Sequence, residues 1–97
     1  MRFSWDPENS DANFRDRSFD FAFASLIFEG PTLEREDTRR DYGERRIMAI
    51  GLAAGLELTM CYTDRVNRDG AVERRIISAR RSNRGERKAY QEAVQSR

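Results

Sequence analysis

The 97-residue chain carries 18 Lys and Arg side chains and 17 Asp and Glu side chains, contains no histidine and has a single cysteine. The lack of histidine excludes Ser-His and Cys-His dyads, and with one cysteine it also excludes an intramolecular disulfide and the usual zinc ligand sets. No apolar run approaches the roughly 20 residues that span a bilayer, and residues 1–10 lack the apolar core of a signal peptide. We therefore expect one domain, over residues 1–97, that works in the cytoplasm without a metal or other cofactor.

The charge is unevenly distributed along the chain. Residues 1–43 carry 6 basic against 10 acidic side chains, residues 44–64 carry 2 against 3, and residues 65–97 carry 10 against 4. The net charges of these segments are therefore −4, −1 and +6. Arginine clusters of this kind are typical of phosphate recognition, although a solvated basic face is the simpler alternative.

The first elements are indicated by capping residues. Residues 2–5 can form a short strand. Asp6 is a good helix N-cap, and Pro7 suits the first helical position because its missing N–H costs nothing there. We predict a polar helix over residues 7–16.

Residues 19–28 are nearly all apolar and fit two patterns. Their phenylalanines alternate as in a strand, whereas Phe19, Phe23 and Ile27 recur at helical spacing. Ser18 as a cap and the Gly-Pro pair that follows favour a helix over 19–28. Because a helix that is apolar on most sides is hard to bury in so small a domain, some of these side chains could form a binding interface, with complete burial as the alternative.

Residues 31–44 are polar and of mixed charge, and we predict a loop there. Three runs with β character follow, at 45–51, 56–63 and 71–80. The last two are joined by an Asn-Arg-Asp-Gly turn at 67–70. An antiparallel three-stranded sheet is the simplest arrangement of these runs.

The chain closes with a predicted helix. It begins at Ser82 or Asn83 and continues to about Ser96, with Glu86 in the position that completes a capping box with Asn83. Two N-terminal helices, a three-stranded antiparallel sheet to which a short N-terminal strand can be added, and a C-terminal helix make an α+β fold.

The third β run and the last helix meet in an arginine-rich junction. Strict alternation places Arg75, Ile77, Ala79 and Arg81 on one side of the strand and Arg74, Ile76, Ser78 and Arg80 on the other. A helix N-terminus beside Arg80, Arg81 and Arg84 would suit a phosphate group. Arginine at a sheet edge also prevents unwanted strand addition, which is the alternative explanation.

Other candidate residues have two interpretations each. Tyr62 and Tyr90 can stack on nucleobases, or they can belong to the core with their hydroxyl groups at its rim. Glu44 and Glu86 can orient an arginine or act as a base, and Glu86 can equally serve only as a capping residue. Cys61 is expected to be a small strand residue, since no histidine is present to activate it.

Motifs spread over almost the whole chain, from Phe3 to about Ala93, form a combined pattern. In chain order they are F-x-W-D (Phe3, Trp5, Asp6), Asn13, F-x-x-A…F (Phe21, Ala24, Phe28), GER-R (Gly43 to Arg46), AIG (Ala49 to Gly51) and RIISARR…ER-x-x-Y (Arg75 to Arg81, Glu86, Arg87, Tyr90). Together they resemble the BrnT toxins, the toxin halves of BrnT/BrnA type II toxin–antitoxin systems.

The resemblance implies a RelE/ParE-like fold, RNA cleavage and bacterial growth arrest. It also implies a BrnA-like ribbon-helix-helix antitoxin that neutralises the toxin in a hetero-oligomer. The two would repress their shared operon, so that operator DNA is contacted only through the antitoxin. The polar residues that match the family by position are Glu44, Arg46, Arg75, Ser78, Arg80, Arg81, Glu86 and Tyr90.

A ribonuclease that uses no metal must hold the phosphate, stabilise its developing charge and move two protons while the 2′-OH attacks. For the first two tasks we expect Arg75, Arg80 and Arg81, which cannot act as bases because guanidinium stays protonated. Glu44 is the first candidate for proton transfer, with Glu86, a tyrosine or Lys88 as alternatives. The side chains expected to bind the substrate are Arg46, Arg84, Lys88, Tyr90 and Tyr62.

One departure from the family leaves the activity open. Where the family usually reads Lys-His-Gly, this chain has Asp16, Arg17 and Ser18. If the Lys-His pair takes part in chemistry, a slower nuclease is expected; if it is only a turn between helices, nothing follows. The alternatives are a toxin of the same fold directed at DNA gyrase, and a degenerate toxin that acts only as an antitoxin-bound co-repressor.

Overall fold

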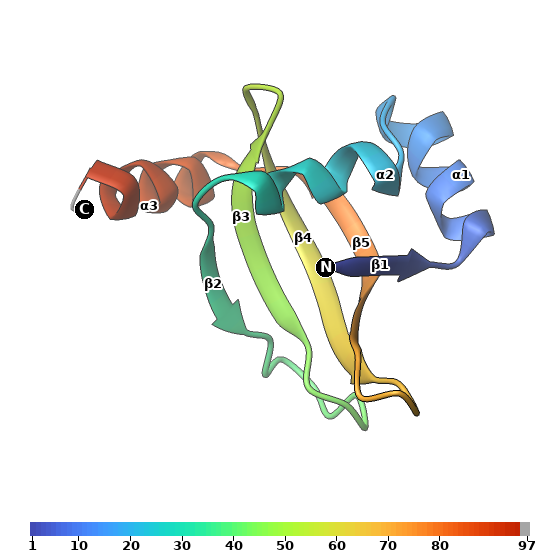
Figure 1. Cartoon of the computed structure of the whole chain (residues 1–97). Helices are drawn as coiled ribbons and strands as arrows, with labels where there is room; N and C mark the ends of the chain where they lie inside the picture. Colours follow the sequence, from blue (N-terminus) through green and yellow to red (C-terminus); the bar gives the residue numbers. More distant parts are fainter. Residues whose placement is uncertain (96–97) are drawn as a thin grey trace.

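Figure 1 shows the computed structural model of the chain, which describes residues 1–95. The elements are β1 (Arg2–Trp5), α1 (Pro7–Arg17), α2 (Phe21–Ala24), the 3₁₀ helix η1 (Ser25–Glu29), β2 (Leu33–Glu36), β3 (Ile47–Ala53), β4 (Leu56–Val66), β5 (Val72–Arg81) and α3 (Arg84–Gln95). The strands form one sheet in the order β1-β5-β4-β3-β2. All neighbours are antiparallel except β1, which runs parallel to β5. This confirms the predicted α+β class and is consistent with a RelE-like fold.

The sheet is wider than the three strands predicted. The N-terminal strand at residues 2–5 is present, but the prediction of a loop over 31–44 is wrong for Leu33–Glu36, which pairs with β3. The sequence of this strand, Leu-Glu-Arg-Glu, is mostly polar because an edge strand is held by backbone hydrogen bonds with little side-chain burial. The predicted end of the last helix, at Ser96, lies outside the described residues.

The first helix is capped as its sequence indicates. Asp6 accepts a hydrogen bond from the Glu8 N–H at 2.9 Å, and Pro7 occupies the first turn. The helix ends at Ser18, whose backbone is left-handed with φ 69° and whose N–H bonds the Phe14 carbonyl. The prediction that Ser18 caps the second helix is therefore wrong: Asp20 does so, accepting from the Phe23 N–H at 2.9 Å.

The predicted helix over 19–28 is a short α turn followed by η1, and it lies across one face of the sheet (Figure 1). Phe19 and Ile27 are buried, while Phe23 and Leu26 are half-buried against the core. The segment thus covers the sheet with its apolar side chains, but the alternative of complete burial does not hold for Phe23 and Leu26. Close approach requires a glycine in β3, since a Cβ on Gly51 would lie 2.9 Å from the Ile27 Cβ.

We call the face covered by α1, α2 and η1 the helix face, and the opposite one the open face. The prediction of strict alternation along β5 is wrong because the strand contains a bulge. Cys61 pairs with Ser78 but Tyr62 pairs with Ile76, so Ile77 is the extra residue. Ile76 and Ala79 therefore both enter the core.

Candidate functional site

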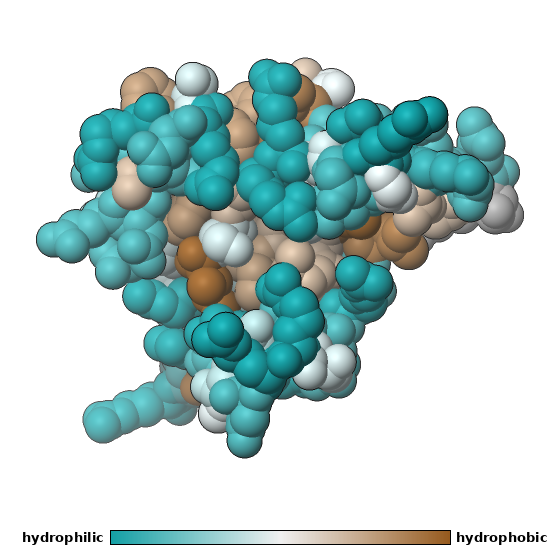
Figure 2. Space-filling model, turned by 180° about the vertical axis from the view of Figure 1, so that it is seen from behind, coloured by the Kyte–Doolittle hydropathy of each residue, from teal (hydrophilic) through white to brown (hydrophobic). Residues whose placement is uncertain are grey.

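The open face of the sheet carries a groove. Figure 2 shows this face, with apolar surface in its middle and hydrophilic side chains around it. Two adjoining cavities of about 390 and 330 Å³ form the groove and share Arg35, Met48 and Glu86. The larger cavity is mostly apolar and is completed by Leu33, Glu34, Ile50, Thr59, Asn83, Gly85 and Ala89. The smaller one is completed by Glu36, Asp37, Thr38, Arg39 and Arg80. An apolar floor beside a charged compartment is thus the main feature of this face.

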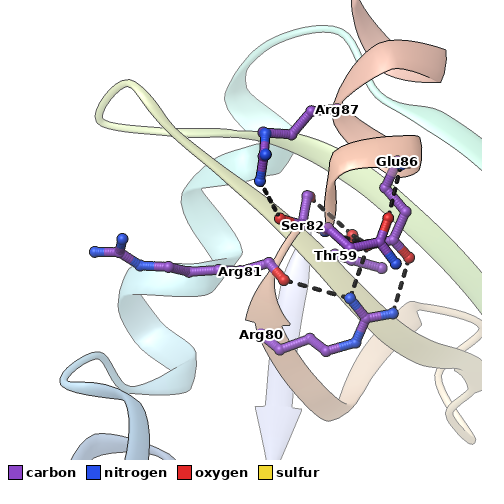
Figure 3. A network of polar contacts seen from close by, with 7 residues as sticks. Thr59, Arg80, Arg81, Ser82, Glu86 and Arg87 are labelled. Atoms are coloured by element: carbon purple, nitrogen blue, oxygen red, sulfur yellow. Dashed lines mark hydrogen bonds and ion pairs between the residues drawn. The ribbon is translucent and has the colours of Figure 1, made fainter.

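Arg80 and Glu86 form the wall of the groove where β5 leads into α3. The Arg80 Nη1 and Nη2 atoms lie 2.7 and 2.8 Å from the two oxygens of Glu86 (Figure 3). The Glu86 carboxylate also accepts from Thr59 Oγ1 and from the Asn83 N–H, while the Glu86 N–H donates to Asn83 Oδ1. The predicted capping box is therefore present, and the same carboxylate fixes Arg80.

The contacts decide the chemistry of this pair. Hydrogen bonds from Arg80 hold the pKa of Glu86 at about 2, and the same contact raises the pKa of Arg80. A carboxylate with so low a pKa and so many donors is a poor proton acceptor at neutral pH. The Glu86 side chain is 16% exposed, but that of Arg80 is 41% exposed. Arg80 is thus held in place and still open to a ligand.

A second set of contacts fixes the backbone below Arg80. The Ser82 N–H donates to the Glu57 carbonyl at 3.1 Å, and the hydroxyls of Ser82 and Thr59 lie 2.8 Å apart. Arg87 Nη1 donates to the Ser82 carbonyl at 2.8 Å. These bonds join the end of β5 to β4 and to the first turn of α3, so the position of Arg80 follows from the sheet and not from a loop.

The opposite wall is formed by the segment that connects β2 to β3. The Asp37 side chain is only 2% exposed and accepts from Arg39 Nε and Nη2, both at 2.9 Å, and from the Tyr42 hydroxyl at 3.1 Å. The Asp37 N–H donates to the Arg46 carbonyl at 2.8 Å. Arg39 holds the pKa of Asp37 well below its usual range. This arrangement was not predicted, since the segment has no motif beyond mixed charge.

Charges of both signs surround Cys61 near the middle of the open face. Burial raises the pKa of this thiol, Asp37 and Glu44 add to the rise, and Arg46 and Arg39 oppose it. Cys61 is buried and free, so it is a strand residue as expected. The cluster matters because it brings Glu44 and Arg46 to the same face as Arg39.

The Glu44 carboxylate is shared between two arginines. It accepts from Arg46 Nε at 3.0 Å and lies 3.7 Å from Arg65 Nη2. The Arg46 guanidinium lies over the Tyr42 ring at 4.1 Å from its centroid. Glu44 is therefore placed beside the groove as an arginine partner, one of the two roles expected for it.

The arginine pairs of β5 are divided between the two faces. Arg75 is opposite Thr63 and Arg80 opposite Thr59, and both threonines are on the open face. Arg74 lies on the helix face, where it pairs with Asp64 at 2.8 Å and stacks over the Tyr62 ring at 4.0 Å. In each pair, one arginine therefore lies on the helix face and the other on the open face.

Several expected site residues do not join the groove. Arg81 extends away from Arg80 (Figure 3) and lines a hollow on the helix face with Phe19 and Phe23. Tyr62 is buried, with its hydroxyl donating to Glu34, and burial raises its pKa. Neither Tyr62 nor Tyr90 is available for stacking on a base in this conformation.

Tyr90 and two cations lie on α3. Tyr90 is buried and donates its hydroxyl to the Pro31 carbonyl at 2.8 Å, which ties the helix to the start of β2. Arg84 and Lys88 are exposed. They can add positive charge beside the groove without being part of its wall.

The three residues that depart from the family pattern lie at the end of α1. Arg17 donates to Asn13 Oδ1 at 3.0 Å, and Ser18 is the left-handed residue that ends the helix. Both line the helix-face hollow that contains Arg81. The departure thus lies at a turn between helices, on the side of the sheet away from the groove.

Two kinds of feature are absent from the part of the chain that the structure describes. Residues 1–95 contain no group of three or more His, Cys, Asp or Glu side chains placed to hold a metal ion. Over the same residues there is no helix with the length and apolar character that a bilayer crossing requires.

Comparison with protein families gives a match over residues 5–86 to the family described as the ribonuclease toxin, BrnT, of type II toxin–antitoxin systems. The matched region runs from the end of β1 to the first turn of α3 and contains Arg80 and Glu86. A comparison with curated proteins finds no match.

Proposed function

The chain belongs to the BrnT family of ribonuclease toxins of type II toxin–antitoxin systems, and we propose that it cleaves RNA in the groove of the open face without a metal ion. The observation that carries this proposal is the fixed and partly exposed guanidinium of Arg80. Its carboxylate partner, its strand and the helix that follows all restrict its position. A preorganised cation of this kind stabilises phosphoryl transition states because no reorganisation is needed at the moment of reaction.

The proposed reaction is attack of an RNA 2′-OH on the neighbouring phosphorus, with departure of the 5′-oxygen of the next nucleotide. Arg80 contacts a non-bridging oxygen, and Arg75 and Arg46 extend the positive surface along the strand. Glu86 orients Arg80 and takes no proton, since its pKa is about 2. Glu44, held beside the groove by Arg46, is proposed to accept the proton of the 2′-OH, and water supplies the proton to the departing 5′-oxygen.

The larger cavity suits the nucleoside part of the substrate. Its floor of Met48 and Ile50, with Ala89 on the side of α3, offers an apolar surface against which a base or ribose can pack. Base contacts of this kind need no ring on the protein, because every base has an apolar face. We therefore place the phosphate in the smaller compartment and one nucleoside in the larger.

Membership of a type II system implies an antitoxin partner and an RNA substrate. The finer proposal is that the antitoxin is a BrnA-like ribbon-helix-helix protein that binds the toxin, neutralises it and carries the pair to operator DNA. Its support is the family alone. Co-expression of such an antitoxin should restore growth, and the antitoxin should co-purify with the toxin. Restored growth without a complex would contradict this proposal.

The test of the proposed function is induction of this chain in a bacterium without its antitoxin, followed by pulse labelling of protein and DNA synthesis. We expect protein synthesis to stop first, with fragmented RNA, and Arg80→Ala to abolish both effects. Arg15→Ala, an exposed arginine at the end of α1, is the control for charge loss. Arg81→Ala removes the arginine on the opposite face of β5, and this variant should still arrest growth almost as strongly as the wild type.

Other outcomes would point elsewhere. Loss of DNA synthesis with intact RNA would indicate a gyrase-directed toxin in place of a ribonuclease. No arrest from well-expressed, folded protein would indicate a co-repressor that has lost its activity.

A further inference from the structure

The segment between β2 and β3 presents one arginine to the groove in a fixed position. Its start is anchored by the bond from the Asp37 N–H to the Arg46 carbonyl, at 2.8 Å. Its middle is anchored by the Tyr42 hydroxyl, which donates to Asp37, and by the Tyr42 ring, which lies under Arg46. The Arg39 side chain therefore extends from an ordered segment and not from a free loop tip.

The burial of the two partners in this ion pair is very unequal. Asp37 is 2% exposed at its side chain and Arg39 is 74% exposed. Asp37 receives two hydrogen bonds from the Arg39 side chain, one from the Arg39 N–H and one from Tyr42. A buried carboxylate with so many donors fixes the position of the guanidinium that it binds. The outer edge of the Arg39 guanidinium takes little part in packing and faces solvent.

Arg39 and Arg80 face the same compartment. Both line the cavity of about 330 Å³, with Met48 in its floor. Glu86 raises the pKa of Arg80, and the positive charge of Arg39 opposes this rise, so the two guanidinium groups are close enough to repel each other. Each guanidinium is paired with its own carboxylate, Arg39 with Asp37 and Arg80 with Glu86. Two fixed cations directed at one polar cavity are complementary to an anion between them.

We propose that Arg39 is a second phosphate-binding residue, which with Arg80 holds one RNA phosphodiester from opposite walls of the groove, and that Asp37 is its positioning residue. The inference rests on the proposed ribonuclease function. It adds a group from the β2–β3 segment to a site otherwise built from β5 and α3. Arg39 contacts the substrate, while Asp37 acts only through Arg39.

The test compares Arg39→Ala with Arg40→Ala, the adjacent exposed arginine. Binding is measured with a single-stranded RNA whose 2′-OH groups are methylated, and cleavage with the same RNA unmodified. Arg39→Ala should lower kcat/KM at least about tenfold and reduce the salt dependence of binding by about 0.7 in the log–log slope, the value for one phosphate contact on a single strand. Arg40→Ala should change neither.

Two further variants separate binding from folding. Arg39→Lys keeps the charge but loses the two-point contact with Asp37, so it should recover RNA affinity more than cleavage. Asp37→Asn should lower cleavage with an intact thermal unfolding transition, which shows that the fold survives.

The outcomes distinguish this inference from the function on which it rests. Wild-type cleavage and salt slope in Arg39→Ala, with loss of cleavage in Arg80→Ala, would overturn the role of Arg39 and leave the groove in place. Absence of RNA binding and cleavage by the wild-type chain would overturn the proposed function and this inference together.

Discussion

Glu86→Gln tests whether the ion pair at the end of β5 positions Arg80 or merely closes the helix. Glutamine keeps an amide oxygen that can accept from Asn83 and Thr59, so the capping box can survive. Its amide nitrogen, however, faces the Arg80 guanidinium, donor against donor. The variant thus removes the charge and the two-point grip while preserving the size of the side chain.

The magnitude follows from the pKa of Glu86. A fall from the usual 4.5 to about 2 corresponds to about 3 kcal/mol, at about 1.4 kcal/mol for each tenfold change in acid strength. Because the Arg80 side chain is 41% exposed, solvent screening reduces this to about 1–2 kcal/mol. The free energy of unfolding of the variant should be lower by that amount at pH 7.

The contribution of Glu86 to stability depends on pH in a direction that follows from its pKa. Since the pKa of Glu86 is lower in the folded chain, its contribution to stability is complete above about pH 4.5 and is lost as the pH falls towards 2. The difference between wild type and Glu86→Gln in urea unfolding should therefore close over this range. Glu36→Gln is the control, because its 3.4 Å contact with Arg45 is exposed on both sides and should contribute at most about 0.5 kcal/mol.

The same variant should lower ribonuclease activity by about ten- to a hundredfold, since a misplaced catalytic cation is costly even where folding is intact. A stability difference that persists at pH 2, or wild-type activity in a variant that has lost the predicted stability, would refute the positioning role.

The remaining predictions concern the fold. Ser18→Gly should raise the free energy of unfolding by about 0.5–1 kcal/mol, because glycine adopts φ 69° without strain; urea unfolding measures this, and an unchanged midpoint would contradict it. Gly51→Ala should destabilise by about 1–3 kcal/mol, since the added Cβ meets Ile27 at 2.9 Å; a wild-type melting temperature would show that η1 can move aside. Cys61 should react slowly with iodoacetamide at pH 8 and quickly in urea, because burial raises its pKa; fast reaction of the folded chain would mean that the strand opens.

Local signals in the sequence predicted the elements that local contacts stabilise. The Asp6-Pro7 helix start, the turn at 67–70 and the Asn83–Glu86 capping box depend on residues within four positions of each other. Each was predicted from residue type and spacing, and each is present. The prediction that Ser18 caps the second helix failed because Ser18 instead ends the first helix. Its backbone there is left-handed, a conformation that glycine adopts more easily.

Features that depend on pairing partners were not predictable in the same way. Leu33–Glu36 is a strand only because β3 offers it backbone groups. The bulge at Ile77 places Arg75 on the same face as Arg80, and Arg74 on the same face as Arg81, and nothing in the alternating pattern of β5 indicates it. Arg80 was correctly expected on the side of Ser78 and opposite to Arg81, but which side of the strand covers the core required the structure.

The candidate site shows the same limit. Arginine density predicted Arg80 and its helix, whereas the Asp37–Arg39 pair arises from a segment whose ends are brought together by the hydrogen bond to Arg46. For Tyr62 and Tyr90 the sequence left both a core and a base-stacking interpretation open, with the core the more common of the two. Burial supports the core interpretation for both.

The role of Arg80 in metal-independent RNA cleavage in the open-face groove can be tested directly. The most direct measurement incubates purified wild-type and Arg80→Ala chains with end-labelled RNA, with and without EDTA. We expect fragments that end in a 2′,3′-cyclic phosphate or a 3′-phosphate, at a rate that EDTA does not change, with a loss of about a hundredfold or more in the variant. Cleavage that disappears with EDTA, or that Arg80→Ala retains, would contradict this expectation.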